Sequence, residues 1–292
     1  MAMFQRVRPA YMIGGVAAAG IGLTLLSRNL TSEASADTGA PRKIFPGGPA
    51  FVSLPLESSE LVNHNTKRLR FKLPEPDAVT GLPLEASLLT FAWPKGSWRP
   101  DGKPYTPVTT ADEPGFLELL VKHYPEGRMS THLHSLQPGD RLRFVAPLKG
   151  YAWSPNRHAH ITLIAGGAGI TPMYQLIQGI LRNPEDATKI TLVFGVNSDA
   201  DLLLKDEFDR FEKQYPGRFR ATYTVSRPGS WSPHRKGYVT QELLREVLPK
   251  DGGSSKVFVC GPPGLEEALL GEKNKPGILE QLGYGKDKVH KF

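Results

Sequence analysis

The sequence has 292 residues, a formal net charge of +7 and a single cysteine, Cys260. A chain of this length holds about two domains with hydrophobic cores of their own. One cysteine excludes an internal disulfide and favours a reducing compartment. The excess of positive charge is mild and contains no long basic run. This argues against a nucleic-acid-binding protein and is compatible with phosphate ligands, acidic partners or an anionic membrane.

The N-terminus differs from the rest of the chain because residues 11–26 form an uncharged, apolar run with arginines on both sides. The run is slightly shorter than the roughly 20 residues that span a bilayer, and neighbouring residues nearly close the gap. It lacks the cleavage site of a secretory signal and the amphipathic character of a mitochondrial transit peptide. We therefore expect residues 1–30 to be a retained single-pass membrane anchor, suited to a thin membrane. Residues 31–50 are rich in Ser, Ala, Gly and Pro, which predicts a linker.

Short apolar or alternating runs follow the linker, separated by turn residues such as "EPDAVTGLP" and "QPGD". Runs of this length and spacing are typical of strands in an antiparallel barrel or sandwich. We assign residues 51–152 to such a domain, with strands predicted at 51–56, 66–73, 86–93, 116–124 and 140–148.

From about residue 158, strand patterns alternate with helical patterns. This alternation predicts a parallel sheet covered by helices, which we assign to residues 153–292. Thr240 precedes one helical pattern as an expected N-cap. The predicted strands are 161–165, 190–194, 220–225 and 256–260, and the predicted helices are 173–182, 206–215, 240–248 and 261–270.

The turn "GGAGITP" lies between a predicted strand and a predicted helix, at the carboxyl edge where open α/β sheets bind ligands. Gly166, Gly167 and Gly169 allow positive φ angles and a close approach of the backbone to a ligand. We expect Thr171 to cap the helix and Pro172 to lie in its first turn. Such a helix start favours an anion. The turn lacks the Lys-Ser/Thr pair of a Walker ATP site and departs from G-x-G-x-x-G spacing, so a purely structural turn is the alternative.

Two further motifs carry candidate ligand-binding residues. "VFVCGPPG" ends a predicted strand at Cys260 and turns through Gly261, Pro262 and Pro263, on the same edge as the glycine turn. The thiol would lie beside a flat ring, or it is an ordinary buried cysteine. In the first domain, "GKPYTPVTT" supplies the cation Lys103, the aromatic Tyr105 and the hydroxyl of Thr106.

The stretch "GRMSTHL" predicts a second anion cradle at the start of a short helix. Its members are Gly127, the amides of Arg128 and Met129, and the hydroxyl of Ser130. Strand alternation would place Lys103 and Tyr105 on one face and Thr106 on the other, unless a neighbouring proline kinks the chain.

In their order and spacing, "KPYTPVTT", "GRMSTHL", "GGAGITPMYQLI" and "VFVCGPP" resemble the NADH–cytochrome b5 reductase family of ferredoxin–NADP reductase-like flavoproteins. The resemblance covers residues 51–292, and both chain ends resemble the fungal mitochondrial branch. It implies an FAD-binding β-barrel followed by an NADH-binding α/β domain, in a protein anchored in the mitochondrial outer membrane, with an intermembrane-space form as an additional expectation. It also implies hydride transfer from NADH to FAD and single-electron transfer to cytochrome b5 or a similar haem protein.

The resemblance also implies roles for individual residues. Tyr105 would lie against the isoalloxazine and Thr106 near flavin N5, and Lys122 would stabilise negative charge on the reduced flavin. The alternative for Lys122 is a solvated surface lysine. The expected catalytic residues are Thr106, Lys122 and Cys260. The expected cofactor-binding residues are Lys103, Pro104, Tyr105, Thr106, Lys122, Tyr124, Gly127, Arg128, Met129, Ser130, Gly166, Gly167, Gly169, Thr171, Pro172, Cys260, Gly261, Pro262 and Pro263.

Two departures from the family pattern leave alternatives open. Lys103 stands where an arginine is usual and cannot make the same bidentate contact with a phosphate. Ser226, followed by Arg227, stands where many members carry an aspartate that would repel the 2′-phosphate of NADPH. The competing functions are an NADPH-dependent flavin reductase with another acceptor and a non-catalytic, membrane-tethered nucleotide-binding adaptor. The eight histidines are scattered without metal-ligand spacing, so no metal is expected.

Overall fold

The computed structural model describes residues 39–249, 255–273 and 275–292. The predicted anchor at residues 1–30 and the first part of the predicted linker lie outside the described residues. Within the described ranges, no helix combines the length and the apolar character needed to cross a bilayer.

The first domain contains six strands and one helix, α1 (Arg128–Ser135). The strands pair antiparallel throughout, in the order β4-β3-β6-β1-β2-β5. Each predicted strand is present, although the order leaves β4 and β5 as unpaired edges, so hydrogen bonding does not close the predicted barrel. The strands are β1 (Val52–Asn63), β2 (Thr66–Lys72), β3 (Ser87–Ala92), β4 (Asp101–Tyr105), β5 (Phe116–Lys122) and β6 (Arg141–Leu148).

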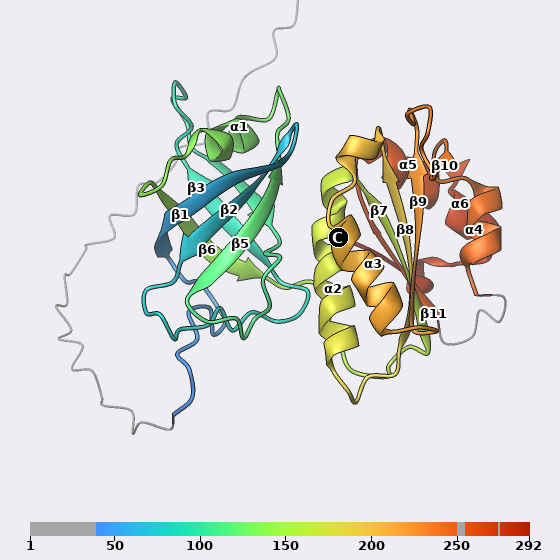
Figure 1. Cartoon of the computed structure of the whole chain (residues 1–292), viewed down its shortest axis with the longest axis horizontal. Coiled ribbons are helices and arrows are strands. Elements are labelled where there is room, and N and C mark those ends of the chain that lie inside the picture. Colours follow the sequence, from blue (N-terminus) through green and yellow to red (C-terminus); the bar gives the residue numbers. More distant parts are fainter. Residues whose placement is uncertain (1–38, 250–254, 274) are drawn as a thin grey trace, which may run out of the picture. The chain divides into compact units, whose positions relative to one another are not determined.

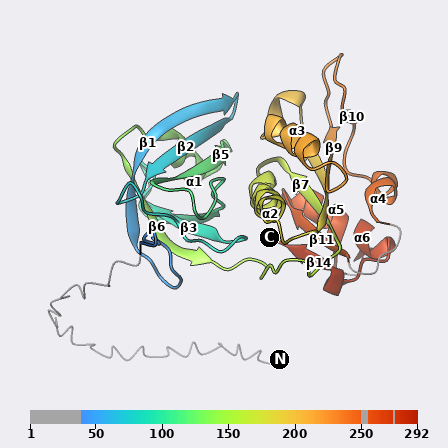
Figure 2. The same ribbon diagram turned by 60° about the horizontal axis from the view of Figure 1, so that its bottom comes forward.

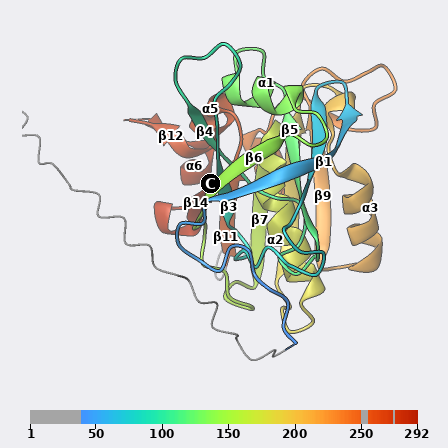
Figure 3. The ribbon, with the colours of Figure 1, turned by 90° about the vertical axis from the view of Figure 1, so that its left-hand side faces the viewer.

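The first domain owes its core to the alternation of side chains along these strands. Leu54 and Leu56 on β1, two residues apart, are both buried because successive odd and even positions face opposite sides of a sheet. Phe71 and Phe144 meet edge to face at a centroid distance of 5.4 Å within this core. Helix α1 buries Met129 against the same core and lies at one end of the strands (Figure 3).

The second domain is a six-stranded sheet in the order β10-β9-β8-β7-β11-β14, with every pair parallel. Its central strands follow the predicted pattern of strand and helix. The strands are β7 (His160–Gly166), β8 (Lys189–Val196), β9 (Phe219–Val225), β10 (Arg235–Lys236), β11 (Ser255–Cys260) and β14 (Val289–Lys291). The helices are α2 (Ile170–Arg182), α3 (Lys205–Gln214), α4 (Gln241–Val247), α5 (Pro263–Leu270) and α6 (Ile278–Gln281). A small hairpin joins β12 (Gly271–Glu272) to β13 (Lys275–Pro276), and the β9–β10 connection projects from the domain (Figure 2).

Helices cover both faces of this sheet (Figure 1). Leu163 of β7 packs in one cluster with residues of α2 and α3, whereas the adjacent Ile164 packs in another with residues of α4, α5 and α6. Burial on both faces explains why the central strands are continuously apolar rather than alternating.

Strand β14 was not predicted. Its three residues, Val289–Lys291, are too few and too polar to signal a strand. They become one by pairing in parallel with the buried strand β11, and Phe292 then stacks on Phe258 at a centroid distance of 5.9 Å. Tertiary pairing rather than local propensity therefore decides the structure of the C-terminus.

The two predicted helix caps have different outcomes. The Thr240 cap is confirmed, because its side chain accepts a hydrogen bond from the Leu243 amide at 3.3 Å. The Thr171 cap is wrong. Residues 167–169 already wind as a 3₁₀ turn, so the N-cap is Gly169 and Thr171 lies inside α2, donating its hydroxyl to the Ala168 carbonyl at 3.3 Å. Pro172 does lie in the first turn of α2, as expected.

The two domains pack within one unit, Pro41–Phe292. Helix α2 supplies polar contacts to the first domain through buried glutamines. The Gln175 amide donates to the carbonyls of Pro107 and Thr109, the latter at 2.7 Å, and the Gln178 amide donates to the Val108 carbonyl at 3.1 Å. These contacts hold the segment that directly follows Tyr105 and Thr106.

Candidate active site

The glycine turn and the Cys260 turn lie against each other at the carboxyl edge of the parallel sheet. Strands β7 and β11 are neighbours in register, with Cys260 beside Ala165. A Cβ on Gly169 would lie 2.2 Å from the Cys260 carbonyl oxygen, and a Cβ on Gly166 would lie 2.8 Å from Cδ of Pro262. Gly166 and Gly169 are therefore required for the packing of the two turns, a role that was not predicted from the sequence.

Gly167 is the member of the glycine turn that has a positive φ, +52°, and a Cβ there would meet no atom within 4 Å. The expectation of positive φ is therefore correct for Gly167 and wrong for Gly166 and Gly169, whose φ angles are −126° and −63°. The adjoining start of α2 has no side-chain cap and no acidic residue in its first turn. The Ile170 amide already donates to carbonyls of the preceding 3₁₀ turn, and Pro172 has no amide hydrogen, so the attraction for an anion at this end comes mainly from the helix dipole.

Helix α1 starts in a similar way. Its N-cap is Gly127, with no side-chain cap and no acidic residue in the first turn. The Ser130 hydroxyl accepts from the Tyr124 amide at 3.1 Å and donates to the Gly127 carbonyl at 2.9 Å, so it closes the preceding turn rather than facing a ligand. The amides of Arg128 and Met129 are left as the donors at this helix start. The buried side chain of Met129 anchors the helix in the core.

Arg128 ties α1 to the loop between β3 and β4. Its guanidinium donates to the Ser97 hydroxyl at 2.8 Å and to the Arg99 carbonyl at 3.1 Å, both through the same nitrogen. A guanidinium carries five N–H donors, so these two contacts leave further donors for an anion.

Lys103, Pro104 and Tyr105 lie on β4, next to β3. Lys103 and Pro104 are exposed, whereas Tyr105 is half-buried against the first core. Burial raises the pKa of Tyr105 above its usual value, with smaller contributions from Asp101 and Tyr124. Thr106 follows the end of β4, so the alternation of a strand does not fix its direction.

Several of the predicted residues from the two domains lie close together. Tyr124 influences the pKa of Tyr105 electrostatically, and Cys260 adds to the effect of burial in raising the pKa of Tyr124. Strand β5, which ends at Lys122, also contacts the glycine turn at residues 167–169. The start of α1 adjoins Tyr124, whose carbonyl accepts from the Gly127 amide at 2.8 Å. The structure therefore gathers a half-buried aromatic, two turns and two helix starts without side-chain caps at the seam between the domains.

Lys122 is not a solvated surface lysine. Its side chain is only 14% exposed, and its ammonium forms an ion pair of 2.8 Å with Asp201 of the second domain. Asp201 was not predicted from the sequence, although "SDAD" carries the signature of a capping box at residues 198–201, which the structure contains. The expected role of Lys122 beside the flavin remains a prediction, and its charge is shared with a carboxylate.

Cys260 ends strand β11 and is partly buried. Burial, assisted by Glu266, raises the pKa of its thiol to about 12, and Lys291 only partly opposes this shift. At neutral pH the group is a protonated thiol, so it can line a ring but cannot act as a thiolate nucleophile.

Ser226 follows the end of β9, where its hydroxyl donates to the Asn197 carbonyl at 3.4 Å. Arg227 lies next to it, and its amide bonds the same carbonyl at 2.8 Å. In the described part of the chain, no group of three or more His, Cys, Asp or Glu residues is arranged to hold a metal ion.

The residues present fit two phosphate-bearing cofactors. Each domain offers one uncapped helix start without acidic neighbours, at Gly127 and at Gly169. Tyr105 and Cys260 supply flat or apolar surface between these two anion sites. FAD on the first domain and NADH on the second would place their rings at the seam, and the assignment of individual residues to either cofactor remains a prediction.

Comparisons with known proteins agree with this arrangement. Residues 53–153 match the oxidoreductase FAD-binding domain family, and residues 163–270 match the oxidoreductase NAD-binding domain family. A protein of Emericella nidulans, NADH-cytochrome b5 reductase 2, is 48% identical over 298 residues, which covers 99% of this chain and 92% of the relative. A protein of Phaeosphaeria nodorum with the same name is 48% identical and covers 97% of this chain and 85% of its own.

Solved structures show the same two-domain fold. The cytochrome b5 reductase domain of Ulva prolifera nitrate reductase has a TM-score of 0.75 and 27% identity, over 87% of this chain and all of that one (100%). The CS-b5R domains of human Ncb5or superpose with a TM-score of 0.72 at 24% identity, over 84% of this chain and 70% of that one. With an antiparallel FAD-binding domain, a parallel NAD-binding domain and near-complete coverage by close relatives, the chain belongs to the NADH–cytochrome b5 reductase family of flavoproteins.

Proposed function

We propose that this protein is an FAD-dependent NADH–cytochrome b5 reductase. The proposal rests on the seam between the domains. Tyr105, Tyr124 and Cys260 lie there, and each domain contributes one helix start that favours an anion. The 48% identity to reductases of this name, over nearly the whole chain, supports the same activity. Bound FAD would supply the chemistry, which is the acceptance of a hydride from NADH and the release of single electrons to a haem protein.

The residues of the chain would bind the two cofactors and orient their rings. Helix α1 and Arg128 would hold the flavin phosphates, and Tyr105 would fix the plane of the flavin ring. Thr106 would donate a hydrogen bond near N5, and Gln175 and Gln178 hold the segment that follows it. The glycine turn and the Cys260 turn would hold the nicotinamide nucleotide. A formal charge of +7 favours association with an acidic haem protein, so the rate of electron transfer should fall as salt is raised.

One sequence feature supports a second candidate function that uses NADPH, rather than NADH, as the electron donor. Many family members carry an aspartate that repels the 2′-phosphate of NADPH. This chain has Ser226 at that position, followed by Arg227, so the repulsion is missing. An NADPH-dependent flavin reductase with another acceptor is therefore the second candidate, and a non-catalytic nucleotide-binding adaptor is the third. NADH is proposed because the relatives are named for it.

One stopped-flow experiment separates these functions. The purified full-length chain loaded with FAD should be yellow and should bleach within seconds on mixing with NADH, much faster than with NADPH, and added cytochrome b5 should become reduced. Failure to retain FAD would overturn all flavin-based proposals. Bleaching by NADPH alone would select the second candidate, and a flavin that no nucleotide bleaches would select the adaptor.

For the cellular location, we propose a single-pass N-terminal anchor in the mitochondrial outer membrane, with the catalytic domains in a reducing compartment. The uncharged run at residues 11–26 with basic flanks supports an anchor. The organelle is proposed because both chain ends resemble the fungal mitochondrial branch. Alkaline carbonate extraction of isolated mitochondria tests the anchor, because an anchored protein stays with the membrane. Release of the full-length protein into the supernatant would rule the anchor out, and a shorter released species would identify an intermembrane-space form.

A further inference from the structure

We propose that Asp201 is a positioning residue for hydride transfer from NADH to FAD. It holds the ammonium of Lys122 in place and fastens the turn at residues 198–201 of the NAD-binding domain to the FAD-binding domain. The proposal rests on the proposed function, because the step that it positions is hydride transfer between the two domains.

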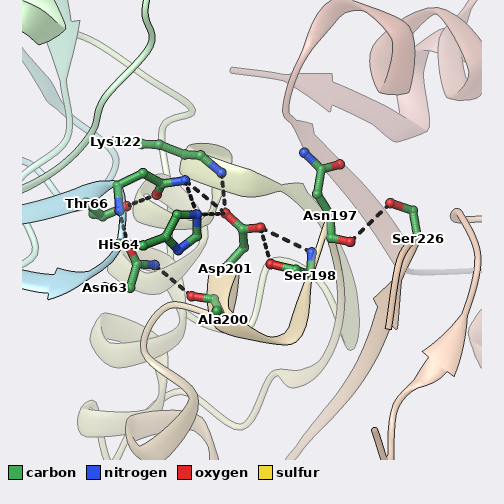
Figure 4. Close-up of polar contacts among 10 residues, drawn as sticks. Asn63, His64, Thr66, Lys122, Asn197, Ser198, Ala200, Asp201 and Ser226 are labelled. Carbon is green, nitrogen blue, oxygen red and sulfur yellow. Dashed lines mark hydrogen bonds and ion pairs between the residues drawn. The ribbon is translucent and has the colours of Figure 1, made fainter. Parts of the chain in front are cut away.

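The turn that carries Asp201 follows β8 in the chain. Figure 4 shows the hydrogen bonds between Asp201 and Ser198 that close it. Asp201 Oδ2 accepts from the Ser198 amide at 3.1 Å and from the Ser198 hydroxyl at 2.7 Å, which closes the turn on itself. Asp199 accepts from the Gly229 amide at 2.8 Å and from the Ser232 hydroxyl at 2.5 Å, so it binds a loop of its own domain. Of the two carboxylates, Asp201 therefore serves the contact with the other domain.

The second oxygen of Asp201 faces the FAD-binding domain. Oδ1 accepts from the Lys122 ammonium at 2.8 Å and from the Asn65 side-chain amide at 3.2 Å. Beside it, the Asn63 side-chain amide donates to the Ala200 carbonyl at 3.0 Å. These donors come from the end of β5 and from the β1–β2 hairpin, which are adjacent because Thr66 pairs with Lys122. One carboxylate thus bridges the end of β5 and the turn between β1 and β2.

Burial makes this ion pair a strong constraint. Asp201 is 6% exposed and the Lys122 side chain 14%. Burial alone would raise the pKa of Asp201, but hydrogen bonds from Lys122, Ser198 and Asn65 outweigh it and keep the pKa well below its usual value. Removing one partner of such a pair leaves the other charge buried and uncompensated, which is far more costly than losing an exposed pair. His64 lies 3.8 Å from Oδ1 but is 55% exposed, so it does not replace Lys122.

The location of the pair explains why it matters for the reaction. Lys122 precedes Tyr124 by two residues, and its strand contacts the glycine turn at residues 167–169. An unpaired Lys122 would swing toward solvent or toward the cofactors, and the two domains would lose a fixed point beside the reacting rings. A displacement of about 1 Å between reacting groups can cost on the order of 100-fold in rate.

The test compares full-length, FAD-loaded variants. Asp201→Asn removes the charge with little change in size, and Asp201→Glu keeps the charge. Asp209→Asn is the matched control, since Asp209 forms a 2.6 Å ion pair with Lys205 on the same helix, α3, of the same domain. We expect Asp201→Asn to retain FAD and to slow hydride transfer at saturating NADH by about tenfold or more. We expect Asp201→Glu to recover part of the rate and Asp209→Asn to stay within about twofold of wild type.

Two further measurements identify a positioning role. In a Lys122→Met background, Asp201→Asn should slow hydride transfer by less than about twofold, because its effect passes through the lysine. Hydrogen exchange of peptides covering residues 60–68 and 196–204 should accelerate in Asp201→Asn and not in Asp209→Asn.

The outcomes distinguish this inference from the proposed function. An active wild-type enzyme with an unimpaired Asp201→Asn variant overturns the inference alone. So does a tenfold loss that persists unchanged in the Lys122→Met background, or an equal loss in Asp209→Asn. A wild-type protein that never reduces its FAD with NADH overturns the proposed function, whereas the exchange measurement still reports on the contact between the domains.

Discussion

The two domains build their candidate anion-binding helix starts in different ways. In the FAD-binding domain, side chains organise the helix start: Ser130 closes the turn and Arg128 holds a neighbouring loop. In the NAD-binding domain, the helix start depends on residues without side chains, because Gly166 and Gly169 allow the glycine turn and the Cys260 turn to touch. A site built from side chains can be weakened in steps. A site built from backbone contact tolerates no added methyl group where the turns meet, so the two domains should respond differently to small substitutions.

The largest effect is expected for Gly169→Ala. The new Cβ would lie 2.2 Å from the Cys260 carbonyl oxygen, which is backbone and cannot move aside without opening the turn. We expect a loss of about 3 kcal/mol or more in the free energy of unfolding and the loss of NADH binding. Thermal unfolding and NADH titration measure both quantities.

Gly167→Ala is the control in the same turn. It has open space but a φ of +52°, so about 1–2 kcal/mol of backbone strain is expected. Equal losses in the two variants would show that conformational strain, rather than contact between the turns, explains the glycines.

The next largest effect is expected for Tyr105→Ala, which removes a half-buried aromatic side chain from the FAD-binding domain. Loss of about 1.5–3 kcal/mol of apolar contact should weaken FAD binding roughly 10- to 100-fold. Equilibrium dialysis or flavin fluorescence measures the affinity. Tyr238→Ala serves as the control, since Tyr238 is 78% exposed. Unchanged flavin content and turnover in Tyr105→Ala would count against its assigned role.

A smaller effect is expected for Ser130→Ala. The variant loses the hydroxyl that bonds the Tyr124 amide and the Gly127 carbonyl, so the turn before α1 should loosen by about 1 kcal/mol. FAD affinity should fall by roughly fivefold at this energy. Ser135→Ala, at the exposed end of the same helix, should leave the affinity unchanged. A loss as large as that of Gly169→Ala would remove the distinction between the two domains.

The smallest effect concerns Cys260, a side chain within the backbone-built site. Its folded pKa is about 12, against a usual value of 9.0, so from pH 8 to pH 10 the unfolded thiol loses its proton while the folded thiol keeps it. The folded state is therefore destabilised by about 1 kcal/mol over this range. Cys260→Ala should reduce the fall in Tm between pH 8 and pH 10 by roughly 2–4 °C. An unchanged fall in Tm would mean that the native thiol titrates normally.

Much of the architecture was predictable from local pattern. The strands of the FAD-binding domain alternate, and the central strands of the NAD-binding domain are continuously apolar, so each sheet type was expected from its burial. Thr240 was a predictable cap because capping depends on one residue and the amide three positions later. The short strand β14 was not predictable, since its three residues acquire their structure from β11.

The candidate site likewise contains features that local sequence predicts and features that depend on tertiary contacts. Local sequence patterns were sufficient to predict the two domains, the order of their motifs and the two glycine-containing helix starts, because these depend on periodicity and on residues close in the chain. The packing role of Gly166 and Gly169, the direction of the Ser130 hydroxyl and the pairing of Lys122 with Asp201 became evident only in the folded chain. Lys122 and Asp201 are separated by 79 positions and belong to different domains. No local rule pairs two charges at such a distance, and burial at the domain contact is what makes their pairing obligatory.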